Sequence, residues 1–438
     1  MKNRLVTARL VVEIFFPQRS VLRVDGHEYS ASILGKILHV ASEISSFQDA
    51  AIALRVVGEI EISGRQVNKL ASEFGQRMAR ERDTRTEEYL AQPLPRQAKQ
   101  AETSIELAAV FFDGGRMRTR QDNSGPGVHE PHWRETKNAG FHRMHCKPSA
   151  EDPQPDLPGC LCNRPYVEKL VKGLKNTKKE GREEAIQPET PDAAPPNEEA
   201  IQNAPEWQPE TLFRTTISSL CRSEEFGPMM AAEADARGFY TAQRKAFLGD
   251  GLLCNWRIQQ RWFPDFICVA DFIHVVEHIY EVAKAVHANE DQHWQQYVTW
   301  AMDCWQGRVD DFLKQLRDWQ MRLGEPPKDE KLPDTDPRMV VAGEITYFSH
   351  NRHRMDYPRY RREGLPVTSS LAESLVKQIS RRVKGTEKFW NDGPTGEAIL
   401  QLRAARLSDD DRLQHWLRHR PITPFSPRCQ ASSYRLAA

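Results

Sequence analysis

Short apolar segments in the middle of the chain end on acidic residues. Residues 246–249 are followed by Asp250, and residues 266–270 are followed by Asp271. The segment between them, residues 252–262, has the length of a helix. The pattern therefore predicts a strand, a helix and a second strand, with a carboxylate at the carboxyl end of each strand. In open α/β sheets ligand chemistry gathers outside those ends, so this stretch is the first candidate site.

A third aspartate follows a similar segment. Residues 105–112 are strongly apolar and end on Asp113, and residues 133–145 are the expected antiparallel partner. We expect Asp113 to end a central strand, as Asp250 does. Both aspartates precede a glycine, and Asp-Gly is also a common hairpin-turn dipeptide. An ordinary turn is therefore the alternative at each position.

The N-terminal region begins with two short predicted strands, residues 10–16 and 21–24, and a turn at Asp25-Gly26. Helices follow. Ser46 can cap residues 47–57, and Ser63 can cap residues 64–78 after a break at Gly58. The apolar residues of the second helix that fall on one face are Val67, Leu70 and Phe74.

Two helices joined by a short glycine-containing turn suit a helix-turn-helix, whose second helix enters the major groove of DNA. An ordinary helical hairpin is the alternative. If the two helices form a helix-turn-helix, four residues would be available to bases and phosphates: Arg65, Gln66, Asn68 and Lys69.

Polar stretches divide the chain. Residues 80–103 are charged and interrupted by prolines, which is typical of a linker. Residues 147–210 are rich in Pro, Glu, Asn and Lys, which is typical of an irregular insertion, with one helix expected at 166–176. Residues 224–237 are predicted to form a helix that Gly238 ends.

The second half is mainly helical. One helix is expected from Asp271 to about His287. Apolar residues then recur at alternating three- and four-residue steps over 294–323, which predicts one long amphipathic helix stopped by Gly324. With the polar loop behind it, this helix forms an insertion before the last core element. Further helices are predicted at 369–385 and 396–419.

Composition narrows the classes of partner. The 438 residues are 39% hydrophobic and 28% charged, with a formal net charge of zero. An anionic partner would therefore be held by local basic patches. No apolar run approaches the roughly 18 residues of a membrane span. Arg9 and Glu13 interrupt the N-terminal apolar run, so a signal peptide is not expected.

The eight cysteines are scattered, which favours a reducing cytoplasm over a disulfide framework. Cys146, Cys160 and Cys162 lie near His142 and His145, which permits a zinc site, although C-x-C is not a standard ligand spacing.

A basic and aromatic segment, residues 347–362, precedes the predicted helix at 369–385. Arginines interleaved with aromatic residues hold phosphate backbones and stack bases, and a solvated basic loop is the alternative. The candidate DNA contacts in the segment and on the helix are Arg352, Arg354, Arg361, Lys377, Arg381 and Lys384.

Three acids could converge, since Asp113 and Asp250 end neighbouring strands and Glu373 opens a helix that can cross them. Mg²⁺ prefers oxygen ligands, and two such ions about 3.5–4 Å apart can activate an attacking oxygen and stabilise a leaving one. Ordinary roles are also open. Glu373 has the capping-box spacing with Ser370, and Asp271 and His274 could be an N-cap and a buried histidine.

Several segments in order resemble the DDE transposases of bacterial insertion sequences, specifically the ISKra-type group. The similarity runs from about Asp113 to residue 412, and it rests on FFDGGRMRTR, HWRETKNAGF, FLGDGLLCNWRIQQRWFPDF, ADFIHVVEH and NRHRMDYPRYRREGLPVTSSLAESLVKQISRRVKGTEKFW. The chain departs from the group in its long insertion at 147–210 and in VTSSLAES, where a more glycine-rich segment is expected.

The resemblance implies an RNase H-like fold with a helical insertion before the catalytic glutamate. It implies that Asp113, Asp250 and Glu373 are catalytic and bind two Mg²⁺ or Mn²⁺ ions. Asp271 and His274 match the supporting D-x-x-H pair that follows the second aspartate in related Mutator-like enzymes. Asp271 is therefore the rival for second catalytic aspartate.

We thus expect an α/β protein with an RNase H-like mixed sheet and a helical insertion, preceded by a mainly helical DNA-binding region. The expected parts are a helix-turn-helix region (1–90), a first core segment (104–146 and 207–285), an irregular insertion (147–206), a helical insertion (286–345), a last core segment with the glutamate helix (346–420) and a tail (421–438).

The expected function is that of a transposase, which binds terminal inverted repeats, cleaves DNA and transfers a strand to target DNA. A homo-oligomer on paired DNA ends, in the bacterial cytoplasm with the nucleoid, is expected by the same resemblance. The alternative is a non-catalytic helix-turn-helix DNA-binding protein or a decayed transposase. A host RNase H-like nuclease is a weaker third possibility.

Overall fold

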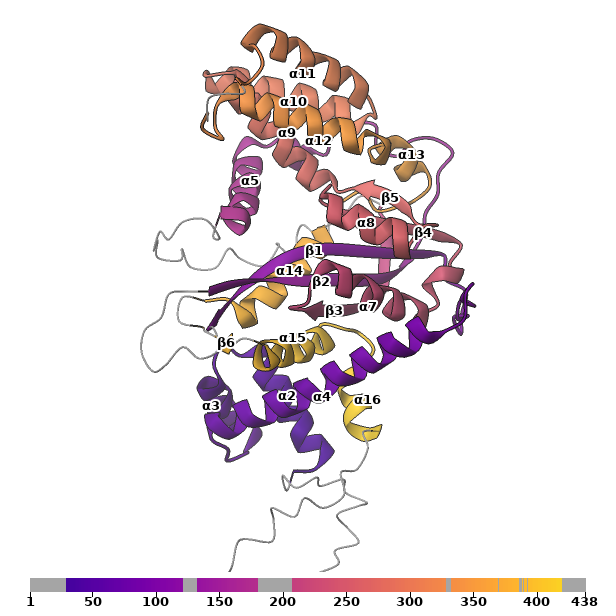
Figure 1. Ribbon diagram of the computed structural model, residues 1–438, viewed down its shortest axis with the longest axis vertical. Coiled ribbons are helices and arrows are strands. Elements are labelled where there is room, and N and C mark those ends of the chain that lie inside the picture. The colour runs from indigo at the N-terminus through magenta and orange to yellow at the C-terminus, as the bar shows by residue number, and fades with distance from the viewer. Residues whose placement is uncertain are drawn as a thin grey trace, which may run out of the picture. The chain divides into compact units, whose positions relative to one another are not determined.

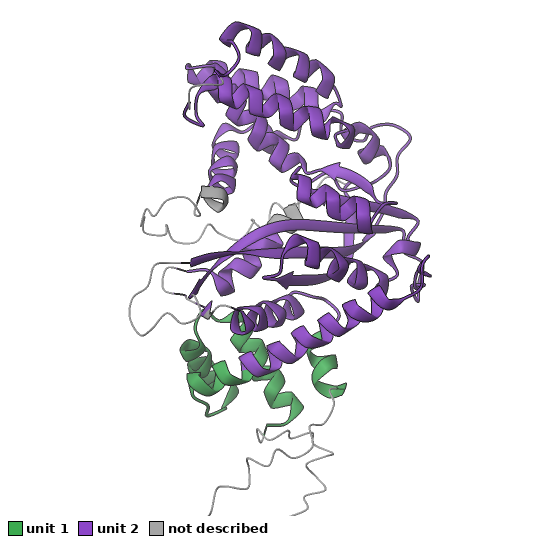
Figure 2. Ribbon diagram, viewed as in Figure 1, with its two compact units in different colours: residues 1–70, 411–438 green, residues 71–410 purple. Residues whose placement is uncertain are grey.

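The structure is a computed structural model that describes residues 29–120, 132–179, 207–327, 332–368, 370–385, 388, 390–391 and 393–419. The chain divides into two compact units (Figure 2). One comprises residues 1–70 and 411–438, and the other comprises residues 71–410. The strands expected at 10–16 and 21–24 lie outside the described residues.

The first unit is helical. It contains α2 (Ala31–Glu43), α3 (Phe47–Gly58), the first turns of α4 (Gly64–Ala91) and α16 (Arg412–His419), and α2 packs on both α3 and α16. The predicted caps are confirmed, because Ser46 Oγ accepts from Asp49 N at 2.9 Å and Ser63 Oγ accepts from Gln66 N at 3.2 Å. The left-handed residue that ends α3 is Glu59, not the glycine before it.

Helix α4 runs much further than residue 78, where the sequence pattern predicted its end. The expected linker at 80–103 is helical as far as Ala91. The reason is a second buried stripe at helical spacing, formed by Ala79, Arg82, Thr86 and Tyr89. Charged residues on the other side of the helix hid this stripe in the sequence.

The second unit is built on a six-stranded mixed sheet with the order β3-β2-β1-β4-β5, and β6 pairs with β1 (Figure 1). β1 is antiparallel to β2 and parallel to β4, β2 is antiparallel to β3, and β4 is parallel to β5. The mixed α/β expectation is thereby confirmed. The strands are β1 (Leu107–Arg120), β2 (His132–His145), β3 (Glu210–Ser219), β4 (Arg244–Gly249), β5 (Ile267–Ala270) and β6 (Trp390–Asn391).

Asp113 does not end its strand. It pairs with Asn138 in the middle of β1, which continues to Arg120, so the expectation of a strand end is wrong. The hairpin-turn alternative is wrong as well, because Asp113 and Gly114 both belong to the antiparallel ladder. Asp250 does follow the last residue of β4, as expected.

The two faces of the sheet carry separate cores, because successive side chains of a strand point to opposite faces. On one face, Leu107, Ala109 and Phe111 pack toward α9 (Phe272–Val286) and the helices that follow it in the chain. Ala108, Val110 and Phe112 pack toward α7 and α8. Asp113 follows Phe111 by two positions and therefore belongs to the α9 face.

Most helices of this unit match the sequence pattern. α7 ends just before Gly238, whose φ is 70°, as predicted. α8 and α9 occupy the two segments expected to flank β5, and α14 occupies the predicted segment before the last strand. Their bounds are α7 (Ser223–Ala236), α8 (Leu253–Trp262), α9 (Phe272–Val286) and α14 (Ser370–Val383).

The single long helix predicted over 294–323 is in fact two, α10 (Glu290–Trp305) and α11 (Val309–Leu323). Gly307 separates them with a φ of 76°, a conformation that an α-helix does not contain. α10 and α12 (Pro337–Asn351) both pack against α9, and α11 packs against α12 (Figure 1). The apolar period continued across the break because both helices bury their apolar stripes in one core.

The insertion expected at 147–206 is partly regular. Its first half contains a short 3-10 turn, η1 (Gly159–Cys162), and α5 (Arg164–Lys179), both packed through Leu161, Val167 and Val171 into the α9 core. Residues 180–206 lie outside the described residues, and β3 begins at Glu210.

Two further differences concern the last third of the chain. The helix expected at 396–419 is two helices in different units, α15 (Pro394–Arg406) and α16. The basic segment at 347–362 comprises the end of α12, the 3-10 turn η3 (Arg352–Arg354) and α13 (Tyr357–Arg362). Among the helices that the structure describes, none has the length and apolarity that crossing a membrane requires.

Candidate active site

Three aspartates follow one register across neighbouring parallel strands. Phe111 of β1 pairs with Leu248 of β4, so two residues further along each strand the register brings Asp113 beside Asp250. Gly249 of β4 pairs with Ala270 of β5, so the next residues in register are Asp250 and Asp271. Three residues far apart in the sequence thus reach one level of the sheet.

The carboxyl group of Asp113 lies in a crowded and acidic environment. Its pKa is raised to about 7, mainly by burial; the nearby His274 lowers the pKa, and Asp250 and, less strongly, Asp271 raise it. The amide of Gly114 donates to Asp113 Oδ1 at 2.7 Å. Asp113 therefore carries either a proton or a poorly compensated negative charge at neutral pH, and a cation that bound the carboxylate would displace the proton to solvent.

Asp250 is held in place by the residues that follow it. Its Oδ1 accepts from Leu252 N at 3.0 Å and from Asn255 Nδ2 at 2.7 Å. Tyr347 of α12 donates through its hydroxyl to the Asp250 carbonyl oxygen at 3.1 Å. Sequence reasoning missed Tyr347 and Asn255, because neither belongs to a motif.

His274 supplies a positive charge beneath the aspartates. Burial opposes its protonation, but Glu277, Asp271, Asp113 and Asp250 together raise its pKa to about 9. Its Nε2 lies 3.6 Å from Asp271 Oδ2, and its Nδ1 lies 3.6 Å from Glu277 Oε2. Glu277 was missed in the sequence, although its spacing of three residues from His274 on a helix was a usable signal.

Asp271 has the ordinary role that the sequence left open as well as its position in the cluster. It is the N-cap of α9, and its side chain accepts from Ile273 N at 3.2 Å. It is almost completely buried and paired with His274.

Glu373 lies in α14, on the same face of the sheet as Asp113. A side chain added at Gly115 would meet Val376 at 3.4 Å, and one added at Gly140 would meet Leu375 at 3.5 Å, which places this helix directly over β1 and β2. Glu373 precedes Val376 by one helical turn. Its side chain, and therefore the predicted capping box with Ser370, lies outside the described residues.

The donor atoms of the site suit a hard cation. Asp113 and Asp250 offer carboxylate oxygens, the ligands that Mg²⁺ prefers. Gly114 N donates to Asp113 Oδ1, and Leu252 N and Asn255 Nδ2 donate to Asp250 Oδ1. No group of three or more His, Cys, Asp or Glu side chains in the described part of the chain is arranged to hold a metal ion. The side chain of Glu373, the expected third ligand, lies outside the described residues.

The predicted DNA-binding residues of the first unit lie at the start of α4. Arg65, Asn68 and Lys69 are exposed and Gln66 is partly exposed, while Val67 and Leu70 are buried on the opposite side. The helix thus presents its polar residues to solvent, as recognition of a groove requires.

Among the basic residues of the 347–362 segment, Arg361 does not belong to the surface. It is completely buried, its Nε donates to Asp152 Oδ1 at 2.7 Å, and its guanidinium lies 4.1 Å from the Trp305 ring centre. It joins the insertion to the α9 core, and its assignment to a DNA contact is corrected on that ground. The aromatic residues of this segment that suggested base stacking, such as Tyr357 and Tyr360, are buried inside the protein.

The other basic candidates remain at the surface to different degrees. Arg352 is exposed and ion-pairs with Asp310 at 3.2 Å. Arg354 is partly buried over the Trp256 ring at 4.4 Å. On α14, Lys377 and Arg381 are exposed and Lys384 is partly exposed.

The cysteines and histidines considered for zinc do not form a common site in the described residues. Cys146 is buried and its thiol donates to the carbonyl oxygens of Glu363 and Gly364. His142 contacts Thr211 at 3.2 Å and His145 contacts Glu106 at 2.8 Å. The side chains of Cys146, His142 and His145 are thus engaged in separate structural contacts, while Cys160 and Cys162 are exposed.

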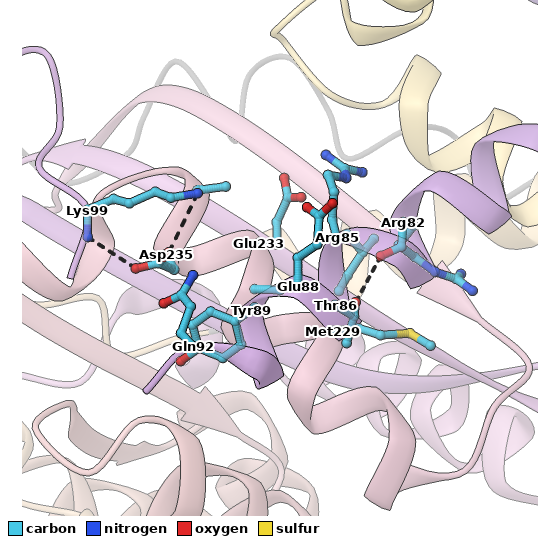
Figure 3. Close-up of a pocket in the computed structure, with 13 residues that line it drawn as sticks. Arg82, Arg85, Thr86, Glu88, Tyr89, Gln92, Lys99, Met229, Glu233 and Asp235 are labelled. Atoms are coloured by element: carbon cyan, nitrogen blue, oxygen red, sulfur yellow. Dashed lines mark hydrogen bonds and ion pairs between the residues drawn. The ribbon is translucent and has the colours of Figure 1, made fainter. Parts of the chain in front are cut away.

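A pocket of about 100 Å³ lies elsewhere in the second unit, between the last turns of α4 and helix α7 (Figure 3). Two of its acidic groups have basic partners. Asp235 accepts from Lys99 N at 3.2 Å and lies 3.9 Å from Lys99 Nζ, and Glu233 pairs with Arg237 at 3.0 Å. The pocket therefore offers packing and local charge compensation rather than reactive groups.

Comparisons with known proteins add no family to this description: no protein-family model matches the chain, and no curated protein is significantly similar to it.

Proposed function

We propose that this protein is a DDE-type transposase that cleaves DNA at the ends of its own element and joins them to target DNA. One observation carries the proposal: Asp113 and Asp250 occupy one level of adjacent parallel strands, on the face that α14 and Glu373 cover. The strand order β3-β2-β1-β4-β5, with three antiparallel strands followed by two parallel ones, is compatible with the RNase H-like core that the sequence resemblance implies. Helices α10 to α12 then correspond to the insertion before the catalytic glutamate.

In this proposal Asp113, Asp250 and Glu373 hold Mg²⁺ or Mn²⁺. The bound ions would supply activation of an attacking hydroxyl and stabilisation of a leaving one. The chain's own contribution is positioning. Leu252 N and Asn255 Nδ2 orient the Asp250 carboxylate, and the α9 N-terminus with protonated His274 balances part of the negative charge before an ion enters.

DNA-end recognition is assigned to α4. Arg65 and Lys69 would hold phosphates, while Gln66 and Asn68 would read base edges, because amide side chains pair with adenine in the major groove. Arg352, Arg354, Lys377, Arg381 and Lys384 would contact DNA nearer the aspartates. A homo-oligomer on paired ends is part of the same proposal.

The test is cleavage of a labelled duplex that carries the inverted repeat flanking the gene. Purified protein with Mn²⁺ should nick this duplex and not a scrambled one. Asp113→Asn, Asp250→Asn and Glu373→Gln should each lower the nicking rate by at least about a thousandfold, since each removes a ligand of the ions that carry the chemistry. End binding, measured by gel shift, should persist.

Asp265→Asn is the matched control, because Asp265 is an exposed aspartate in the same stretch and pairs only with Lys245 at 3.7 Å. It should cleave like the unchanged protein. End binding without cleavage by the unchanged protein would favour the non-catalytic alternative. Full activity of Asp250→Asn, with none in Asp271→Asn, would give the second catalytic position to Asp271.

A further inference from the structure

Two consecutive leucines stand in solvent beside the aspartate cluster. Leu252 is 59% exposed and Leu253 is 65% exposed, although both directly precede the buried residues Asn255 and Trp256. Single exposed apolar residues are common and need no explanation. These two differ because they are adjacent, because they follow Asp250 by two and three positions, and because the loop that carries them is rigidly held.

The backbone before the leucines is fixed by α12. Gly251 has a φ of 94°, and a Cβ atom there would lie 2.5 Å from the Tyr347 ring, so this position requires glycine. Asn351 Nδ2 donates to the Gly251 carbonyl oxygen at 3.3 Å, and Trp256 Nε1 donates to Asn351 Oδ1 at 2.8 Å. The leucines thus stand on a firmly held backbone at the start of α8.

The backbone of Leu252 lies close to the Asp250 carboxylate of the proposed metal site. The Leu252 amide nitrogen lies 3.0 Å from Asp250 Oδ1. Successive phosphates of a strand advance by about 3.4 Å along the helix axis, so a phosphate held near Asp250 brings the adjacent base step within reach of these side chains. Proteins kink or open a duplex by inserting apolar side chains such as leucine between base steps.

We propose that Leu252 and Leu253 form an apolar wedge that separates the bases next to the phosphate cleaved at the aspartate site. This inference rests on the proposed function and adds the form of the substrate, a locally unstacked strand. Unstacking gives the phosphodiester the freedom to approach the carboxylates, and a base that is already unpaired costs least to displace. The wedge therefore assists cleavage most on fully paired DNA.

The test compares two duplexes with the double variant Leu252→Ala/Leu253→Ala. One duplex is fully paired, and the other carries a mismatch at the base step beside the cleaved phosphate. The double variant should cleave the paired duplex about tenfold to a hundredfold more slowly than the unchanged protein. On the mismatched duplex it should come within about threefold, because the unpairing is already done.

Leu212→Ala is the matched control. Leu212 is a 56% exposed leucine on β3, and its loss should alter cleavage of neither duplex. A second measurement does not depend on cleavage. With 2-aminopurine at the same step, Asp113→Asn should raise the fluorescence on binding, and the triple variant Asp113→Asn/Leu252→Ala/Leu253→Ala should not.

The outcomes separate the wedge from the proposed function. If the unchanged protein cleaves neither duplex, both fail. If the unchanged protein cleaves and the double variant loses the same fraction of its cleavage rate on both duplexes, the wedge alone is overturned. The wedge alone is also overturned if the double variant loses no cleavage rate. The wedge is also overturned if the double variant changes the molar mass in light scattering, since the leucines would then join copies of the chain.

Discussion

Asp113 and Asp250 stand side by side because the register that pairs Phe111 with Leu248 continues for two residues in both strands. β4 ends at Gly249, whereas β1 continues to Arg120. One carboxylate therefore comes from a rigid mid-strand position and the other from the first residue of a loop. Asn255 and Tyr347 hydrogen-bond to Asp250, so the loop position is held in place as well.

The first prediction concerns stability and the Asp113 carboxyl. Its folded-state pKa of about 7 exceeds the ordinary 3.8, so the folded state binds the proton more tightly. The unchanged protein should lose stability as pH rises from about 4 to 7. Asparagine at position 113 should abolish this loss of stability, because its amide does not titrate. In chelator, Asp113→Asn should be more stable than the unchanged protein at pH 8, by on the order of 1–4 kcal/mol.

Urea unfolding at pH 4 and pH 8 measures this difference, which should nearly vanish at the lower pH. Asp265→Asn, at an exposed carboxylate, should show no such pH dependence. An Asp113→Asn protein less stable than the unchanged one at pH 8 would contradict the acidic crowding described above.

The second prediction concerns added metal. Divalent ions that bind only the folded state stabilise it by about 2.7 kcal/mol at a hundred times the dissociation constant. Mn²⁺ should therefore raise the melting temperature of the unchanged protein without DNA. The rise should be much smaller in Asp113→Asn and in Asp250→Asn. An equal rise in all three, measured by differential scanning fluorimetry, would place the ion elsewhere.

The third prediction concerns His274. Its folded pKa of about 9 lies above the ordinary 6.5, so its charge stabilises the fold fully below pH 6.5 and ceases to do so as pH rises through 9. His274→Gln should be destabilised by about 3 kcal/mol at pH 6, because Asp271 and Glu277 lose their buried counter-charge. The deficit should shrink by pH 9.5.

Chemical denaturation across this pH range provides the measurement. His278→Gln serves as the control, since His278 also belongs to α9 but pairs with Glu344 of α12, at 2.9 Å. A His274→Gln deficit that is constant with pH would mean that packing, not charge, is lost.

The fourth prediction separates buried from exposed arginines in the basic segment. Arg361→Ala should destabilise the fold by about 3–5 kcal/mol, because it leaves the Asp152 carboxylate without its partner. Arg352→Ala should change stability by less than about 0.5 kcal/mol, as its ion pair is solvent-exposed. The DNA affinity of folded protein should fall only in Arg352→Ala. Chemical denaturation measures the stability of each variant, and fluorescence-anisotropy titrations measure its DNA affinity. A stable Arg361→Ala protein with reduced DNA affinity would restore Arg361 as a DNA contact.

The fifth prediction concerns α4. Lys69→Ala should weaken binding to all DNA sequences and lower the salt slope of log affinity by about one, because one phosphate contact is lost. Gln66→Ala should leave the slope unchanged and reduce discrimination between the cognate end and a point-mutated one by about 1–3 kcal/mol. Identical salt slopes for Lys69→Ala and the unchanged protein would argue against a groove-binding helix.

The sequence predicted local structure well where a short-range signal was present. Ser46 and Ser63 capped the expected helices, and Gly238 ended another. The segment around Asp250 and Asp271 formed the expected strand, helix and strand. Prediction failed where local patterns were ambiguous: charged residues concealed the buried stripe of α4, and Gly307 broke an uninterrupted apolar period into two helices.

The sequence by itself determined which residues could do chemistry, because carboxylates after apolar segments and exposed basic residues at a helix start are local features. Only the tertiary structure decided which of them meet. Strand register aligned Asp113, Asp250 and Asp271, burial removed Arg361 from the surface, and α12 supported the loop of Leu252 and Leu253. These relations depend on register and contacts between segments that are distant in the sequence, as between Asp113 and Asp250 or between Arg361 and Asp152, and no local period encodes them.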